Sequence, residues 1–174
     1  MAISKIHAQK IFEDILNNMV GSGLFEIPTD KIKSELAFNK RTSALGCCKY
    51  TKRNGEFVSY EISLSEYAMK DETCIRNTLA HEIIHTMPRC QNHGATFKVN
   101  AILCKRIGYD VSTRASIEES EACGILDAQK IKAKYEIKCP NCDKRWYRSR
   151  MCSLVKNPGR YICGDCRSPL TRVC

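Results

Sequence analysis

The sequence predicts an α+β protein, with a core of helices and a small sheet followed by a short metal-bound module. Three observations support this: apolar residues at helical spacing near the N-terminus, a hairpin signal between two strand-like runs, and two C-x-x-C pairs in the last quarter. A chain of 174 residues suits one domain plus such a module. We expect a core domain over residues 1–129 and a separate module over residues 130–174.

The first part of the core domain combines a helix and a sheet. Apolar residues over 3–20 recur with the period of an amphipathic helix, which Gly21 can end, and a short helix is expected near Thr29–Asp30. Asn54-Gly55 favours a tight hairpin turn, because both residues tolerate positive φ. A small antiparallel sheet is therefore expected before the next helix. Its strand-like runs cover residues 36–38, 44–51 and 56–65.

A helix over about residues 72–87 carries the main chemical motif. Asp71 or Thr73 can cap its start, and Pro88 terminates it or follows its end. One face of this helix is apolar and can anchor it in a core. That face consists of Ile75, Leu79, Ile83 and Met87.

A further helix is expected over residues 95–107, ending at Gly108. Residues 109–134 allow two interpretations, a helix broken at Gly124 or a mobile connector. From Tyr135 onward the sequence is typical of short strands and turns. The residues of the 95–107 helix that we expect to point inward are Phe97, Ala101, Ile102 and Ile107.

Residues 81–85 read His-Glu-Ile-Ile-His. Positions four apart on a helix point in nearly the same direction, so His81 and His85 can bind one zinc ion. Glu82 lies beside them and can reach a water at the metal without replacing a ligand. The alternative, two solvated histidines on a surface helix, fits poorly with Ile83 and Ile84 as neighbours.

A catalytic zinc site usually has three protein ligands and one open position. His93 is the better third ligand, because residues 86–92 can turn the chain and Gly94 lets the backbone bend as the next helix begins. Cys90 is closer in sequence, but it would make a thiolate-rich and less hydrolytic site. His7 is expected at the surface of the N-terminal helix.

The run HEIIHTMPRCQNHGATFK resembles the SprT-like metallopeptidases, which include the Spartan-type proteases of DNA–protein crosslinks. The family combines H-E-x-x-H, a variable loop, and H-G-x-x-F followed by a basic residue. The similarity covers about residues 5–170, and many bacterial members also end in a zinc ribbon. It implies a zincin-like core and zinc-dependent hydrolysis of peptide bonds. The loop before the third histidine is short beside the Spartan type, which bears on substrate access. The residues that match the motif are His81, Glu82, His85, His93, Gly94, Phe97 and Lys98.

The implied mechanism has Glu82 accept a proton from the water that attacks a peptide carbonyl and pass it to the leaving nitrogen. A second donor for the oxyanion is often needed. Tyr67 and Tyr109 are candidates, and the sequence places neither. It also does not decide between zinc and another divalent ion such as Mn²⁺.

The C-terminal module contains a four-cysteine signature. Two C-x-x-C pairs separated by 20 residues predict a closed, structural zinc site, since each pair places two sulfurs on one side of a tight turn. A module this short needs the metal to fold. The four predicted ligands are Cys139, Cys142, Cys163 and Cys166.

The other eight of the twelve cysteines lack this spacing. The N-terminus alternates charged and apolar residues and does not resemble a signal peptide, so a reducing compartment is expected. In such a compartment these cysteines are best interpreted as buried or incidental thiols. They are Cys47, Cys48, Cys74, Cys90, Cys104, Cys123, Cys152 and Cys174.

The net charge of +9 is unevenly distributed. Residues 1–129 hold 16 basic and 16 acidic residues, whereas residues 130–174 hold 12 basic and 3 acidic ones. Such an excess suggests nucleic acid as a partner, although a basic tail can also serve solubility alone. Aromatic side chains beside arginines can stack on bases while the cations bind phosphate, or they can pack the small ribbon core. The candidate DNA contacts are Lys144, Arg145, Trp146, Arg148 and Arg150.

Three functions fit these features. The first is a zinc metallopeptidase recruited to DNA, with one catalytic and one structural Zn²⁺, acting on bound or crosslinked proteins. The second is a nucleic-acid-binding or transcription-associated protein on a non-hydrolytic scaffold, and the third is a general cytosolic peptidase whose ribbon docks protein. The intact Glu82 favours an enzyme. We expect a monomer in the cytoplasm, nucleoid or nucleus, and no membrane partner, because no apolar run is long enough to span a bilayer.

Overall fold

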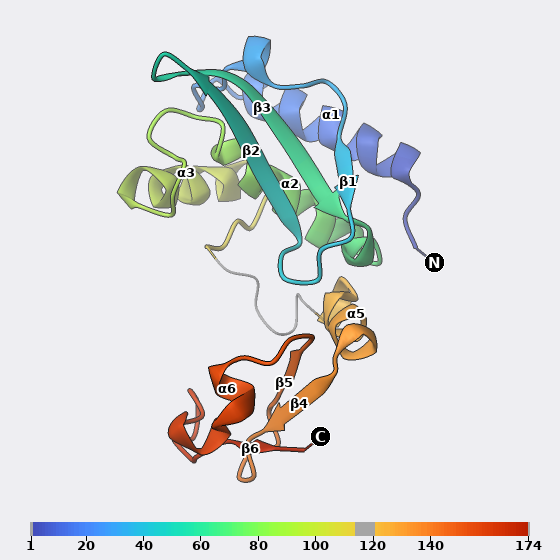
Figure 1. Ribbon diagram of the computed structural model, residues 1–174. Helices are drawn as coiled ribbons and strands as arrows, with labels where there is room; N and C mark the ends of the chain where they lie inside the picture. Colours follow the sequence, from blue (N-terminus) through green and yellow to red (C-terminus); the bar gives the residue numbers. More distant parts are fainter. Residues whose placement is uncertain (1, 114–120, 174) are drawn as a thin grey trace. The chain divides into compact units, whose positions relative to one another are not determined.

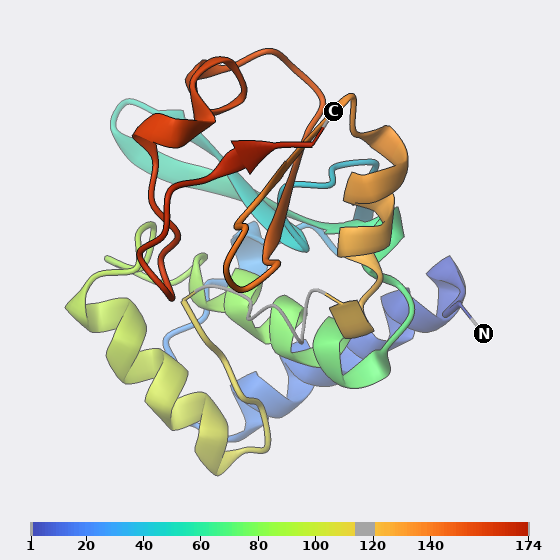
Figure 2. The same ribbon diagram turned by 90° about the horizontal axis from the view of Figure 1, so that it is seen from below.

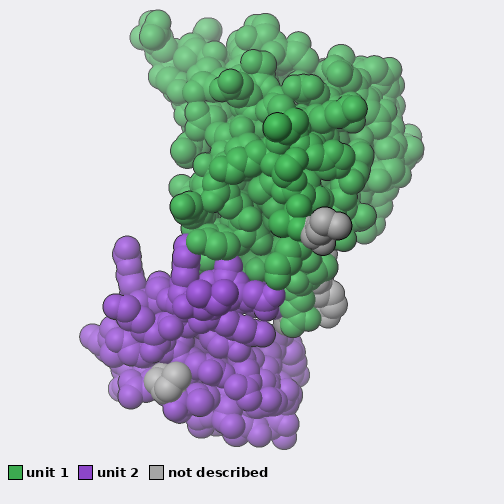
Figure 3. All heavy atoms as spheres, turned by 90° about the vertical axis from the view of Figure 1, so that its right-hand side faces the viewer, with its two compact units in different colours: residues 1–125 green, residues 126–174 purple. Residues whose placement is uncertain are grey.

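The computed structural model describes residues 2–113 and 121–173. The chain divides into two compact units, residues 1–125 and residues 126–174, which Figure 3 draws in different colours. The division falls at the first residue of helix α5 (Ile125–Lys132), a few residues before the expected boundary. Each unit has its own apolar cluster of buried side chains, so each is described separately.

The larger unit contains three helices and a three-stranded sheet within its described residues. Two short 3₁₀ turns, η1 and η2, flank the strands. The elements are α1 (Lys5–Gly21), η1 (Thr29–Lys31), β1 (Ala37–Asn39), β2 (Gly46–Arg53), β3 (Glu56–Ser65), η2 (Glu66–Ala68), α2 (Glu72–Ile84) and α3 (Ala95–Arg106).

The sheet has the strand order β1-β3-β2, so β2 is an edge strand. Strands β2 and β3 are antiparallel and are joined by Asn54 and Gly55 at φ 53° and 85°, which confirms the predicted hairpin. Strand β1 lies parallel to β3, with Ala37 opposite Ser63, so the sheet is mixed and not purely antiparallel. A strand of three residues carries too little pattern to fix the direction of its pairing.

The helices cover one face of the sheet (Figures 1 and 2), and α2 lies between the sheet and α1. Asp71 caps α2, because its carboxylate accepts a hydrogen bond from the backbone N–H of Cys74 at 2.7 Å. The predicted apolar face of α2 is fully buried, which fixes the helix against both neighbours. The buried residues of that face are Ile75, Leu79 and Ile83, and Met87, three residues past the end of α2, is buried as well.

Helix α3 departs from the prediction at one position. Phe97 and Ala101 are buried as expected, and Ile107 is partly buried, but Ile102 is 64% exposed. Ile102 follows Ala101 by one residue, about 100° around the helix, so both cannot face a narrow contact with the core. The helix ends at Arg106, two residues before the predicted Gly108, which has a φ of 92° that glycine adopts readily.

The structure answers the open question about residues 109–134 in part. Residues 114–120 lie outside the described residues. Helix α5 begins directly after Gly124. This glycine has a φ of 84°, which interrupts the helical conformation, as the prediction of a helix broken at Gly124 requires.

Cys74 and Cys123 form a disulfide in the structure, 49 residues apart in the chain. The interpretation of these two cysteines as free thiols is therefore wrong. Neither cysteine belongs to a C-x-x-C pair that would mark it in the sequence. Only the fold brings the start of α2 next to residue 123. They pack in a small apolar cluster with Ala68 and Ile125.

The smaller unit is a ribbon of three short strands in the order β5-β4-β6, all paired antiparallel. Ile137, Val155 and Leu170 form its apolar core together with buried cysteines. No helix within residues 2–113 and 121–173 is long and apolar enough to cross a membrane. After α5, the ribbon contains β4 (Tyr135–Lys138), β5 (Arg145–Arg148), α6 (Ser153–Lys156), η3 (Pro158–Arg160) and β6 (Thr171–Arg172).

Candidate metal centres

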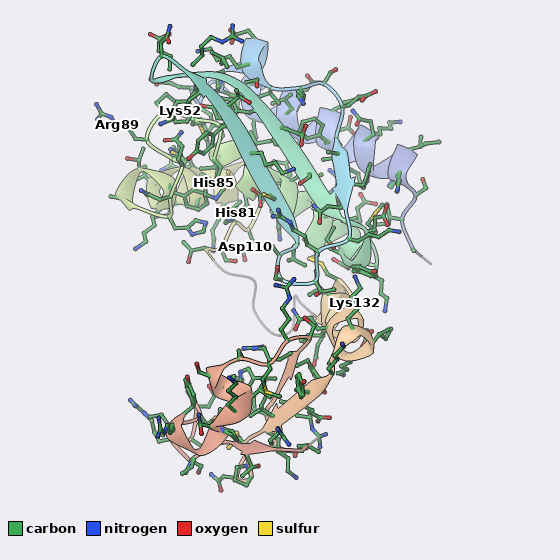
Figure 4. All side chains as sticks on the ribbon, viewed as in Figure 1. Lys52, His81, His85, Arg89, Asp110 and Lys132 are labelled. Carbon is green, nitrogen blue, oxygen red and sulfur yellow. A yellow bond between two sulfur atoms is a disulfide. The ribbon has the colours of Figure 1, made fainter. Side chains whose placement is uncertain are left out.

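His81 in helix α2 and His85, the C-cap residue that follows it, lie on the side opposite the buried apolar face, beside strand β2 (Figure 4). The loop after α2 returns the chain so that His93 faces the same point. Arg89 in this loop has a φ of 61°, and Asn92 accepts a hydrogen bond from the backbone N–H of Gly94 at 2.9 Å. This turn places His93 immediately before α3.

The three imidazole Nε2 atoms converge. His81 and His85 Nε2 lie 3.1 Å apart, His85 and His93 Nε2 3.2 Å, and His81 and His93 Nε2 3.0 Å. The ring of Phe97 packs against all three imidazoles at centroid distances of 4.7–4.8 Å. The structure therefore brings together the three histidines that the sequence singled out.

Backbone carbonyls orient two of the rings. The Nδ1 of His81 lies 2.8 Å from the carbonyl oxygen of Ser112, and the Nδ1 of His85 lies 2.6 Å from that of Cys90. A carbonyl can only accept, so each Nδ1 carries the proton and each Nε2 presents a lone pair to the point of convergence. Cys90 thus serves this centre through its carbonyl, and its sulfur accepts from Asn100 at 3.5 Å.

Burial keeps these rings neutral at physiological pH. Desolvation, followed by the neighbouring His85 ring, lowers the pKa of His81 to about 4. Desolvation also lowers the pKa of His85. Neutral imidazole is the form that binds a metal.

The residues present fit a bound metal ion. Three lone pairs facing one another at 3.0–3.2 Å repel unless a cation lies between them. Tetrahedral ligands at a zinc–nitrogen distance of about 2.0–2.1 Å are separated by about 3.3–3.4 Å, which small outward movements of the rings would produce. Three imidazoles with one open side are also the donor set of a catalytic zinc site.

Glu82 is 7% exposed and faces strand β2, and it is not one of the converging ligands. Desolvation raises the pKa of its carboxyl to about 7, and a backbone hydrogen bond from Cys48 opposes this rise. Gly46 lies so close that an added Cβ would be 2.8 Å from Glu82 Cγ and Oε1. The edge strand therefore holds this carboxyl in place beside the imidazoles.

A pocket of about 310 Å³ opens over this site. Residues of strand β2 and the loop before it line one side, and residues of α2 and the loop after it line the other. Burial and the nearby Glu82 carboxylate raise the pKa of the Cys48 thiol to about 12, so this lining thiol stays protonated. The lining residues are Ala44, Gly46, Cys47, Cys48, Tyr50, His81, Glu82, His85, Gln91 and His93.

Neither tyrosine proposed from the sequence as an oxyanion donor lines this pocket. Tyr109 is buried, and its hydroxyl accepts from Asn18 at 2.9 Å. Tyr67 packs beside the cluster around the disulfide. The roles of Gly46 and of the Ser112 carbonyl were not predicted from the sequence, because each depends on a contact between distant segments that no local pattern marks.

The ribbon contains a second group of converging ligand atoms. Cys139 and Cys166 Sγ lie 3.3 Å apart, Cys142 and Cys163 Sγ 3.6 Å, and Cys142 and Cys166 Sγ 3.7 Å. Tetrahedral thiolates at a zinc–sulfur distance of about 2.3 Å are separated by about 3.7–3.8 Å, so these residues also fit a metal ion. The four side chains leave no open position.

The two C-x-x-C turns, here called cysteine knuckles, begin at Cys139 and Cys163 and have the same pattern of backbone hydrogen bonds. The N–H of Cys139 donates to the carbonyl of Lys144, and that of Cys163 donates to the carbonyl of Ser168, each at 2.8 Å. The fourth residue after each of these cysteines, Asp143 or Arg167, has a φ of 54° or 63°. This repetition explains why a short local motif predicts the site.

Two of the predicted DNA contacts are engaged in ion pairs within the ribbon. Lys144 Nζ lies 2.6 Å from Asp165. Arg145 lies 2.5 Å from Glu136 and 3.1 Å from Asp143. Both cations therefore contact carboxylates of the ribbon itself. The pattern of aromatic and basic residues in the sequence did not indicate these ion pairs.

The remaining three predicted DNA contacts differ from one another. Trp146 lies opposite Ile137 and packs against the ribbon core, the alternative considered for the aromatic residues. Arg148 Nη1 donates to the carbonyl of Tyr147 at 2.8 Å. Arg150 is exposed.

Together, the mixed α+β core and its histidine cluster define a candidate metallopeptidase centre of the HExxH type. The family model described as SprT-like family matches residues 8–119, more than half of the chain. The protein belongs to the SprT-like family. No curated protein and no solved structure matches it.

Proposed function

We propose that this protein is a zinc-dependent metallopeptidase of the HExxH type. The observation that carries the proposal is the convergence of three Nε2 atoms within 3.0–3.2 Å, with Glu82 buried next to them. The family membership supports the same activity. We assign His81, His85 and His93 as ligands of a catalytic zinc ion.

A bound zinc ion would supply the Lewis acidity that polarises a carbonyl and eases deprotonation of water at neutral pH. The carbonyls of Ser112 and Cys90 hold the imidazoles in the required tautomer. Glu82 accepts the proton of the attacking water at its carboxylate and passes it to the leaving nitrogen. Gly46 and Cys48 keep that carboxylate in place.

The pocket wall favours a peptide as substrate. Strand β2 is the edge of its sheet, so one row of its backbone N–H and C=O groups faces away from β3. An extended peptide can pair with such an edge and lie across the site. This geometry supports the proposal that the substrate is a protein segment bound in an extended conformation.

We further propose that the substrates are DNA-associated or DNA-crosslinked proteins, and that the ribbon binds DNA around a structural zinc ion. Residues 130–174 hold 12 basic and 3 acidic residues. Glu136, Asp143 and Asp165, the three acidic ones, all contact Lys144 or Arg145. The surplus positive charge therefore rests on the other basic residues, so Arg150 should contribute more to DNA binding than Lys144 or Arg145.

The test is cleavage of fluorescently labelled casein by the full chain, with and without single-stranded and double-stranded DNA. Wild-type protein should contain two zinc ions per chain, and DNA should increase its activity. Glu82→Gln should reduce cleavage by about 10³-fold while zinc content and DNA affinity stay unchanged. Replacing His81, His85 and His93 with alanine should remove one of the two ions.

Two results would overturn the proposal in different ways. A protein with two zinc ions that binds DNA but cleaves nothing would be the non-hydrolytic nucleic-acid-binding alternative. Cleavage that is independent of DNA, with no DNA affinity, would leave a general peptidase whose ribbon serves another purpose.

A further inference from the structure

Tyr50 lies in the pocket on the same strand face as the residues that hold Glu82. Gly46, Cys48 and Tyr50 share this face, because side chains alternate along β2. Gly46 and Cys48 both contact Glu82. Tyr50 follows Cys48 by two residues, which places it about 7 Å further along the strand. The Tyr50 side chain therefore lines the pocket beyond the general base.

The Tyr50 ring is held while its hydroxyl remains available. The ring packs edge-on against Phe57 at a centroid distance of 5.0 Å, and Phe57 in turn stacks on Tyr60 at 5.7 Å. Tyr50 is 49% exposed. Among the hydrogen bonds within residues 2–113 and 121–173, none involves the Tyr50 hydroxyl. A rigid ring with a free O–H costs little entropy when it binds a substrate.

The other polar lining residues are poorer donors. The side-chain nitrogen of Gln91 donates to the carbonyl of Met87 at 2.9 Å, and Gln91 also hydrogen-bonds to Tyr60. Thiols such as Cys47 and Cys48 are weak hydrogen-bond donors. Among the lining residues other than the three histidines and Glu82, Tyr50 thus has the strongest uncommitted O–H or N–H group.

We propose that the Tyr50 hydroxyl donates a hydrogen bond to the carbonyl oxygen of the scissile peptide as that oxygen becomes negatively charged. This inference rests on the proposed peptidase function and assigns a catalytic residue to it. The hydrogen bond is worth most where the charge develops, so it acts on turnover more than on substrate binding.

The experiment measures steady-state casein cleavage by the full zinc-loaded chain and its Tyr50→Phe variant. Phenylalanine keeps the ring and its contact with Phe57 but removes the hydroxyl. We expect kcat to fall by about 10²-fold and KM to change by less than about twofold. Zinc content and thermal midpoint should stay at the wild-type values. Tyr67→Phe and Tyr109→Phe, which remove hydroxyls outside the pocket, serve as matched controls with unchanged kcat.

Each other outcome contradicts a particular claim. Full kcat in Tyr50→Phe with a raised KM in Tyr50→Ala would make Tyr50 an apolar wall of the pocket and refute the donor role. An equal loss in Tyr67→Phe or Tyr109→Phe would refute the assignment to Tyr50. Absence of cleavage by the wild-type chain would refute the proposed function itself, and with it this inference.

Discussion

The two candidate metal centres of this protein are built in opposite ways. The histidine cluster lies on a core whose buried residues would pack without a metal, and its ligands and orienting groups extend from Gly46 to Ser112. The cysteine cluster belongs to a unit whose apolar core includes the ligands Cys139 and Cys163. The histidine centre is therefore positioned by a fold that forms around it, whereas the cysteine centre stabilises the fold that contains it.

Removal of the metal should have the largest effect and should affect the two centres differently. A strong chelator should unfold the ribbon, because structural zinc sites contribute about 10–16 kcal/mol of apparent binding free energy at neutral pH. The core should keep its helices, since its apolar cluster contains none of the three histidines. Amide NMR spectra of the full chain with and without chelator would report both units separately. If the core unfolds together with the ribbon, the claim that only the ribbon needs its metal to fold is wrong.

The disulfide should give the next largest effect, and it concerns the histidine centre alone. The bond between Cys74 and Cys123 closes a 49-residue stretch that contains all three histidines, Glu82 and Ser112. Replacing both cysteines with alanine should lower the stability of the core by about 4 kcal/mol through the restored entropy of the unfolded chain. Thermal unfolding of the core transition measures this change.

Reductant provides the control for the disulfide. A non-thiol reductant should lower the thermal midpoint of the wild-type core and leave that of the Cys74→Ala/Cys123→Ala variant unchanged. If reductant has no effect on the wild-type protein, the two cysteines are free thiols in solution, as their spacing in the sequence predicts.

The smallest of these effects tests how the fold positions Glu82. In Gly46→Ala the new Cβ would lie 2.8 Å from Glu82 Cγ and Oε1 and from Thr78 Cγ2. We expect about 1–3 kcal/mol of destabilisation and a larger relative loss of casein cleavage, because the general base is displaced. Gly21→Ala is the matched control, since nothing lies within 4 Å of an added Cβ there. Full activity in Gly46→Ala would show that the strand does not position the carboxyl.

Local patterns were sufficient where a few neighbouring residues decide the structure. The spacing of His81 and His85, the hairpin at Asn54-Gly55 and the knuckle at Cys139 each depend on contacts within one turn of chain. The apolar face of α2 was predictable for the same reason, since helical periodicity identifies it. Predicting His93 as the third ligand required one further step, namely the expectation that the chain turns back after Pro88.

The tertiary structure decided everything that depends on distant segments meeting. Which tyrosine lies in the pocket follows from the edge position of β2, and which carbonyl holds His81 follows from the path of the chain after α3. The pairing of Cys74 with Cys123 and the ion pair of Arg145 with Glu136 on the neighbouring strand likewise join residues without a shared local motif. Periodicity and motif spacing describe how a segment presents its own side chains, but the partner of each side chain is set by packing across the whole core.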